Sequence, residues 1–179
     1  MAMTQRKEGV IVPPMSTAGI AAIAQTIRCG IGLEQERFFP IVECYEILDQ
    51  IVPGAHFEVI SDDEMGDDDA LTLPNKKLIR LRNSVYEDAA KRGGRGRFTM
   101  AHEFGHLLLH RNVGFSRVNP NSPPKIYMNS EWQADVFASH LLISESLIYN
   151  LMTPFDIAEE FGVSLAAATA RWNKSQNKK

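Results

Sequence analysis

The chain has 179 residues, of which 44% are hydrophobic and 23% charged, which suits one soluble domain with a core of normal size. Its net charge of −3 excludes a general attraction to nucleic acid or to anionic membranes. No apolar run approaches the roughly 18 residues of a membrane span, and the start of the chain lacks the apolar stretch of a signal peptide. The two cysteines lie outside any CxxC motif and are expected to be reduced thiols. We therefore expect a cytoplasmic protein.

The first 53 residues predict an arm and two helical stretches. Residues 1–16 are expected to form a flexible N-terminal arm that ends at two prolines. Ser16 or Thr17 can cap a helix of small residues that closes at Gly30. Pro40 then opens the segment IVECYEILDQI, whose apolar residues have helical spacing.

The middle of the chain predicts a small sheet. The segments HFEVIS, DALTL and KLIRLRN each alternate between apolar and polar residues, as strands do. The acidic run SDDEMGDDD does not match the spacing of a calcium-binding loop, so a solvated loop is expected there. VYEDAAKR predicts a short helix, and the glycine-rich GGRG a turn after it. The basic stretch KRGGRGR lacks the aromatic side chains that stack on bases and the spacing of a phosphate loop.

The remaining segments are mostly helical. Thr99 is the expected N-cap of a helix from Met100 to about His110, and a polar loop follows over 112–124. SEWQADVFASHLLI predicts a second strong helix, and two short helices are expected around Gly162 before a polar tail. The predicted fold class is therefore α+β, with a main domain over 17–153 and a helix-turn-helix-like pair over 154–179.

The segment RFTMAHEFGHLLLH carries two histidines four positions apart, with a glutamate directly after the first. On a helix, positions i and i+4 lie about 40° apart and roughly 6 Å along the axis, so His102 and His106 can bind one ion. Glu103 lies beside them, where its carboxylate can reach a water on that ion. Gly105 costs the helix about 1 kcal/mol relative to alanine, which indicates a close approach of backbone there. The alternative is a chance pair of surface or core histidines.

A third ligand is expected on the next helix. Catalytic zinc needs three protein ligands and an open fourth position, and Glu131 lies 25 positions after His106. Asp135 shares the face of Glu131 and can accept a hydrogen bond from the second nitrogen of a ligand histidine. A solvated helix face is the alternative, but it fits poorly because both carboxylates are embedded among apolar residues such as Trp132 and Phe137.

RFTMAHEFGHLLLH followed by EWQADVFASHLLI resembles the ImmA/IrrE family of metallopeptidases. The family pattern is RFT-x-AHE-x-GH-x-x-x-H and then E-x-x-A-[ND]-x-FA-x-x-LL. The similarity covers about residues 40–172, and IRLRNSVYEDAAKRGGRGRFT also resembles the strand, short helix and turn before the motif in a prophage-type branch. Ser144 departs from the pattern, because the family usually has a proline there; this should affect only the end of the helix.

The resemblance implies a zincin-like α+β domain that binds one Zn²⁺. Its implied ligands are His102, His106 and Glu131, with Glu103 as the general base. It also implies a bacterial or prophage setting, with a helix-turn-helix repressor as the partner that the enzyme cleaves.

The expected chemistry is metal-assisted peptide hydrolysis. Zn²⁺ held by two histidines and a carboxylate lowers the pKa of its water to about 7, and Glu103 can take that proton and deliver it to the leaving amine. Tyr127 is the nearest candidate for an oxyanion donor; the alternative is that it is an ordinary packing tyrosine. His110 lies roughly 12 Å along the axis from His102, too far to share the ion; it either lines the cleft or is a histidine at the helix end.

Two classes of function remain open from the sequence. One is a zinc endopeptidase that acts on a regulatory DNA-binding protein. The other is a zinc-stabilised regulatory module that binds a repressor or DNA without cleavage. For the C-terminal pair we favour packing or repressor contact over DNA binding, because its second helix offers only Arg171, Asn173 and Lys174, all late in the helix.

Overall fold

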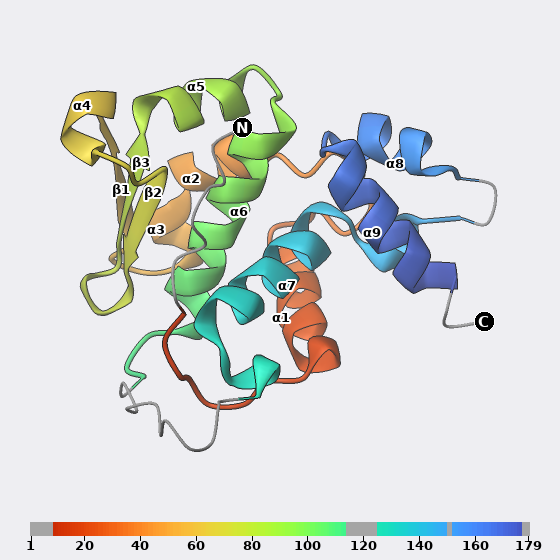
Figure 1. Ribbon diagram of the computed structural model, residues 1–179, viewed down its shortest axis with the longest axis horizontal. Coiled ribbons are helices and arrows are strands. Elements are labelled where there is room, and N and C mark those ends of the chain that lie inside the picture. The colour runs from red at the N-terminus through yellow and green to blue at the C-terminus, as the bar shows by residue number, and fades with distance from the viewer. Residues whose placement is uncertain (1–8, 114–124, 150–151, 177–179) are drawn as a thin grey trace.

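The structure, a computed structural model, describes residues 9–113, 125–149 and 152–176. It has the predicted α+β class: a three-stranded sheet lies on one side of a long helix, and further helices pack on the other side (Figure 1). Most of the predicted loop over 112–124 lies outside the described residues. Among the helices that the structure describes, none is long and apolar enough to cross a membrane.

All three predicted strands are confirmed. They are β1 (His56–Ile60), β2 (Ala70–Leu73) and β3 (Leu78–Arg82), in the order β1-β3-β2. β1 runs parallel to β3, with His56 opposite Leu78, and β2 runs antiparallel to it, with Ala70 opposite Leu81. The acidic run between β1 and β2 is exposed for most of its length but contains a short helix, α4 (Asp62–Met65). Because β2 pairs only with β3 in the described sheet, it is an edge strand.

The helices before the sheet follow the prediction with one interruption. α1 (Thr17–Gly30) is capped by Ser16, whose hydroxyl accepts a hydrogen bond from the backbone N of Gly19 at 3.0 Å. The single helix expected after Pro40 is two, α2 (Ile41–Glu46) and α3 (Leu48–Ile51). They meet at Ile47, whose φ of −110° and ψ of 21° break the helical path.

α6 (Gly94–Leu109) carries the histidine motif and begins six residues earlier than predicted. The prediction of Thr99 as N-cap and of GGRG as a turn was wrong, because these glycines form the first turn of α6 against α5 (Asn83–Ala90). A Cβ on Gly96 would lie 2.5 Å from the carbonyl oxygen of Val85 and 2.7 Å from the backbone N of Ala89. Tertiary contact therefore outweighs the low helix propensity of glycine.

We expect Gly96→Ala to destabilise the protein, because its Cβ would meet the backbone of α5 rather than a side chain that can turn away. Overpacking of this kind costs about 1–3 kcal/mol, against the ~1 kcal/mol gained in helix propensity. Gly30→Ala is the matched control, since a Cβ there meets nothing within 4 Å. Thermal unfolding should show a lower midpoint for Gly96→Ala and an equal or higher one for Gly30→Ala; equal midpoints would contradict the close contact.

α7 (Ser130–Leu142) packs across α6 and is capped by Asn129, whose side chain accepts a hydrogen bond from the backbone N of Trp132 at 2.9 Å. The close approach indicated by Gly105 is made here: a Cβ on Gly105 would lie 3.0 Å from Cδ1 of Phe137 and 3.3 Å from Cα of Ala134. α6 and α7 are therefore held at short range. Around this contact the core collects apolar side chains from α1, α2, the sheet, α6 and α7, including Ile20, Ala24, Ile41, Ile79, Leu81, Met100, Phe104, Leu107, Ala138 and Leu141.

The C-terminal pair consists of α8 (Pro154–Phe161) and α9 (Leu165–Gln176) around Gly162, as predicted. Arg97 of α6, which is 1% exposed, joins this pair to the main domain. Its guanidinium donates hydrogen bonds to the carbonyls of Phe161 at 3.2 Å and Gly162 at 2.9 Å. Arg171 is also buried and contacts the carbonyl of Ile143, so it is turned away from the surface that a DNA-binding helix would present.

Residues 9–16 pass along the start of α7 (Figure 1). Ile11 and Asn129 form an isolated antiparallel bridge, and Val12 is 3% exposed. The backbone N of Val12 donates to the carbonyl of Met128 at 2.9 Å, and that of Ser130 to the carbonyl of Val10 at 3.0 Å. This part of the expected arm is therefore bound to the domain. It meets α7 next to η2 (Ile126–Met128).

Candidate metal centre

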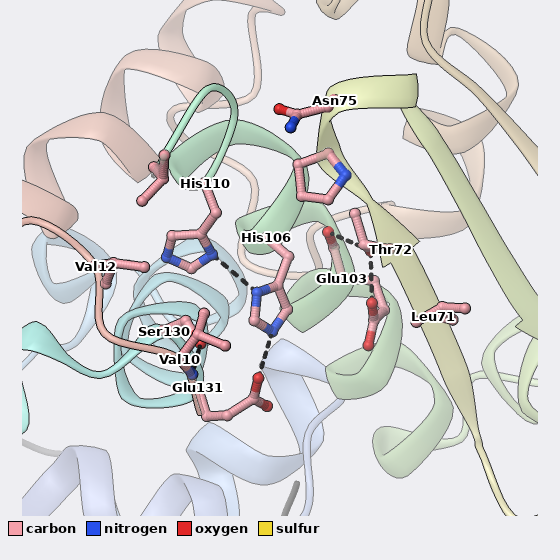
Figure 2. A pocket seen from close by; sticks show the side chains of 12 residues that line it. Val10, Val12, Leu71, Thr72, Asn75, Glu103, His106, His110, Ser130 and Glu131 are labelled. Carbon is pink, nitrogen blue, oxygen red and sulfur yellow. Dashed lines mark hydrogen bonds and ion pairs between the residues drawn. The ribbon is translucent and has the colours of Figure 1, made fainter. Parts of the chain in front are cut away.

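His102, His106 and Glu131 bring three ligand atoms to one point between α6 and α7. Nε2 of His102 and Nε2 of His106 lie 3.0 Å apart. The two oxygens of Glu131 lie 3.2 Å from these nitrogens, Oε2 from His102 and Oε1 from His106. Figure 2 shows His106 and Glu131 pointing toward one another. In the described part of the chain this is the group of histidine and acidic side chains that could hold a metal ion.

The spacing of these atoms fits a zinc-sized ion. With zinc–ligand distances of 2.0–2.1 Å, two ligands of a tetrahedral ion lie about 3.3 Å apart. The observed separations of 3.0–3.2 Å are close to that value. The chemical types also fit, because two neutral imidazoles and one carboxylate are a known donor set of catalytic zinc. A metal could therefore be bound without a large rearrangement of the helices.

His102 is held from behind by the residue predicted for that role. Its Nδ1 lies 2.9 Å from Oδ1 of Asp135, so the ring donates a hydrogen bond to this carboxylate. Burial alone would lower the pKa of His102, but the hydrogen bonds to Asp135 and Glu131 outweigh it and raise the pKa to about 9. Burial would likewise raise the pKa of Glu131, yet its contacts with the two histidine side chains hold it well below its usual range. In the metal-free site the proton on His102 therefore supplies the positive charge that a metal cation would supply when bound.

His106 has a different partner, His110, which ends α6. Nδ1 of His106 lies 2.9 Å from Nδ1 of His110, and Nε2 of His110 lies 3.1 Å from Oε1 of Gln133. His110 is 8% exposed and lines the pocket beside His106 and Glu131 (Figure 2). Burial, and then the neighbouring His106, lower the pKa of His110 to about 4. Sequence analysis missed Gln133, although it lies on α7 two positions after Glu131.

Glu103 lies in the same pocket but on its other wall (Figure 2). The carboxylate is 7% exposed, and the hydroxyl of Thr72 on β2 lies 2.5 Å from its Oε2. The same hydroxyl lies 3.1 Å from the backbone carbonyl of Glu103. The edge strand thus orients the carboxylate. Thr72 was also missed, because alternation along a strand indicates which residues share a face but not what that face contacts.

The pocket itself is lined on both sides of the ligands by apolar side chains, those of Val10, Val12, Leu71 and Val113. Tyr127 is not among the pocket-lining residues in the part of the chain that the structure describes. Its carbonyl instead accepts a hydrogen bond from Gln133 at 2.9 Å, and Nζ of Lys125 lies 5.7 Å from the centre of its ring.

Comparison with known proteins agrees with this site. The model of a peptidase family described as the IrrE N-terminal-like domain matches residues 59–173, about two thirds of the chain. The match includes the whole of β3, α6 and α7, and therefore every residue of the metal centre. No curated protein matches the chain. With this family match and a pocket that joins three metal-binding side chains to a buried glutamate, the chain belongs to the ImmA/IrrE family of metallopeptidase-like proteins.

Proposed function

We propose that this protein is a zinc-dependent endopeptidase that cleaves a DNA-binding regulator of the repressor type. The observation that carries the peptidase part is the convergence of His102, His106 and Glu131 in one pocket with a buried carboxylate that is not a ligand, Glu103. The ligand set leaves room for a water and a substrate carbonyl. The repressor as substrate comes from the resemblance of the two motif helices to the ImmA/IrrE pattern.

The side chains have separate tasks in this reaction. Bound by His102, His106 and Glu131, Zn²⁺ would supply a Lewis acid for the scissile carbonyl and for a water. Glu103 removes the proton from the attacking water and passes it to the leaving amine. Thr72, whose hydroxyl contacts the Glu103 carboxylate, holds it in place for both transfers. Asp135 orients the ring of His102.

The pocket also favours an extended peptide as substrate. β2 pairs with β3 on one side only in the described sheet, so its other edge offers backbone groups next to Glu103. An extended substrate can add to such an edge through main-chain hydrogen bonds. Leu71 and Val113 would then contact side chains beside the scissile bond, and we expect a preference for apolar ones.

Glu103→Gln is the experiment that separates an enzyme from a binding module. The amide keeps the shape of the side chain and can still contact Thr72, but it cannot take a proton from water. Each version is co-expressed with the helix-turn-helix protein encoded beside its gene, and intact masses of the partner are measured. We expect a discrete cut with the wild type, and with Glu103→Gln normal zinc binding and loss of cleavage.

The alternative function gives a different result. A zinc-stabilised module that binds its partner without cutting it would relieve repression equally well as wild type or as Glu103→Gln. Equal relief of a repressed reporter, with an uncut partner in both samples, would reject the peptidase proposal. Glu58→Gln on β1 serves as a matched control variant, because it makes the same substitution at a carboxylate that is 41% exposed, is bonded to Arg80 and is not among the residues that line the described pocket.

A further inference from the structure

His106 is the first member of a chain of hydrogen bonds that ends on two backbone carbonyls. Nδ1 of His106 lies 2.9 Å from Nδ1 of His110, whose Nε2 lies 3.1 Å from Oε1 of Gln133. Nε2 of Gln133 donates to the carbonyl of Pro13 at 2.8 Å and to that of Tyr127 at 2.9 Å. These hydrogen bonds thus connect a metal ligand on α6, through α7, to residues 9–16 and η2.

The position of each proton in this chain follows from its last member. Two carbonyls can accept only from an NH₂ group, so the amide of Gln133 must turn its oxygen toward His110. This oxygen can only accept, and Nε2 of His110 must therefore carry a hydrogen. The Nδ1 of a neutral His110 is then a bare acceptor, so Nδ1 of His106 must be the donor. A metal ligand must be a neutral imidazole, and in neutral His106 this leaves the lone pair on Nε2, the atom that faces His102 and Glu131.

We propose that Gln133 and His110 are positioning residues that fix His106 in the tautomer able to bind the metal. The tautomer of His102 is fixed directly by a carboxylate, that of Asp135, which contacts its Nδ1. On its Nδ1 side His106 has only neutral partners, His110 and then Gln133, so the position of its proton depends on how the Gln133 amide is turned. The carbonyls of Pro13 and Tyr127 set that direction. This inference rests on the metal site of the proposed function.

Burial makes the arrangement rigid. Gln133 is 1% exposed and His110 is 8% exposed, so bulk water cannot readily replace a lost partner. A flip of the Gln133 amide would place its NH₂ against the Nε2–H of His110 and its oxygen against two carbonyl oxygens. The seating of residues 9–16 along α7 is therefore coupled to the geometry of the metal ligand, although no residue of that segment is itself a ligand in the described site.

The test uses the full chain with three substitutions. His110→Phe keeps a ring but removes the acceptor for His106, and Gln133→Met keeps the length of the side chain but removes the acceptor for His110. Gln133→Glu keeps that acceptor, loses the two donated bonds and adds an ionisable carboxyl group. His56→Gln is the control, because it removes an exposed histidine of β1. Zinc affinity is measured by competition with a chelator, and the cobalt-substituted protein by its visible absorption.

We expect His110→Phe and Gln133→Met to weaken zinc binding about 10- to 100-fold and to change the cobalt spectrum. Gln133→Glu and the control should stay close to the wild type in both. Equal weakening by Gln133→Glu and Gln133→Met would overturn the proposal, because it would mean that Gln133 only anchors residues 9–16. Wild-type affinity in His110→Phe and Gln133→Met would overturn it as well.

A second measurement reads the tautomers directly, and for His110 it needs no zinc. In ¹⁵N-histidine NMR spectra of the metal-free protein, His110 should carry its proton on Nε2. In the zinc-loaded protein, His106 should carry its proton on Nδ1. A proton on Nδ1 of His110 overturns the proposed chain even if zinc binds tightly. Absence of zinc binding by the wild type would instead reject the proposed function.

Discussion

Replacing any one of His102, His106 and Glu131 with alanine is expected to abolish tight zinc binding. Each supplies one of the three atoms that lie within 4.8 Å of one another, and in the described residues no other histidine or acidic side chain completes the group. Loss of a residue that hydrogen-bonds a ligand typically lowers metal affinity about 10- to 100-fold, and loss of one ligand should lower zinc affinity by more than that. The purified wild type should hold about one zinc per chain by elemental analysis.

Asp135 provides the graded comparison within this prediction. Asp135→Ala removes the carboxylate 2.9 Å from Nδ1 of His102 and should cost about 10- to 100-fold in affinity. Asp135→Asn should cost less, because the amide oxygen still accepts the hydrogen bond without the charge. His56→Gln should leave zinc content unchanged. Full zinc in His106→Ala would contradict the site, and wild-type affinity in Asp135→Ala would return Asp135 to a solvated helix face.

The residues of the candidate metal centre could be predicted because helices have a strict period. His102 and His106 are separated by four positions, as are Glu131 and Asp135, and each pair therefore lies on one face whatever the helices pack against. The structure brings these two faces together. Gly105 marked the close approach for the same reason, since a glycine inside a helix indicates that a side chain would not fit.

The residues that sequence analysis missed act through tertiary contacts. Thr72 reaches Glu103 from an edge strand, and Gln133 reaches His110 across the space between two helices. No local pattern encodes which strand or helix lies opposite. The start of α6 was misjudged for a related reason: the glycines that predict a turn also permit the contact between Gly96 and α5. His110 is close to His106 rather than to His102, so the distance argument excluded it as a ligand but not as a partner of one.

Zinc affinity is expected to rise about tenfold per pH unit up to about pH 9. Hydrogen bonds to Asp135 and Glu131, which outweigh the effect of burial, raise the pKa of His102 to about 9, so at neutral pH zinc must displace a proton from this ring. Between pH 7 and pH 9 this gives roughly a 100-fold gain. The measurement is competition with a chelator of known pH dependence. Asp135→Asn removes a charge that raises this pKa, so its profile should level off at a lower pH.

Thermal unfolding of the metal-free protein tests the same pKa of His102, but here the measured quantity, stability, falls as the pH rises instead of increasing. The folded His102, with its pKa raised to about 9, keeps its proton up to about pH 9, whereas an unfolded chain releases it near the ordinary histidine pKa of 6.5. Its contribution to the free energy of unfolding is therefore complete below pH 6.5 and is lost as the pH rises toward 9. Below pH 6.5 the buried His110, whose pKa is lowered to about 4, has the opposite effect. The unfolded chain binds a proton on this residue that the folded chain does not bind, so the free energy of unfolding falls as the pH falls. The summed contribution of these two histidines to the stability of the metal-free protein is therefore greatest near pH 6.5, and the midpoint gained on adding zinc should grow from there to pH 9. A zinc-induced shift that is flat across this range would show that His102 is not protonated in the metal-free site.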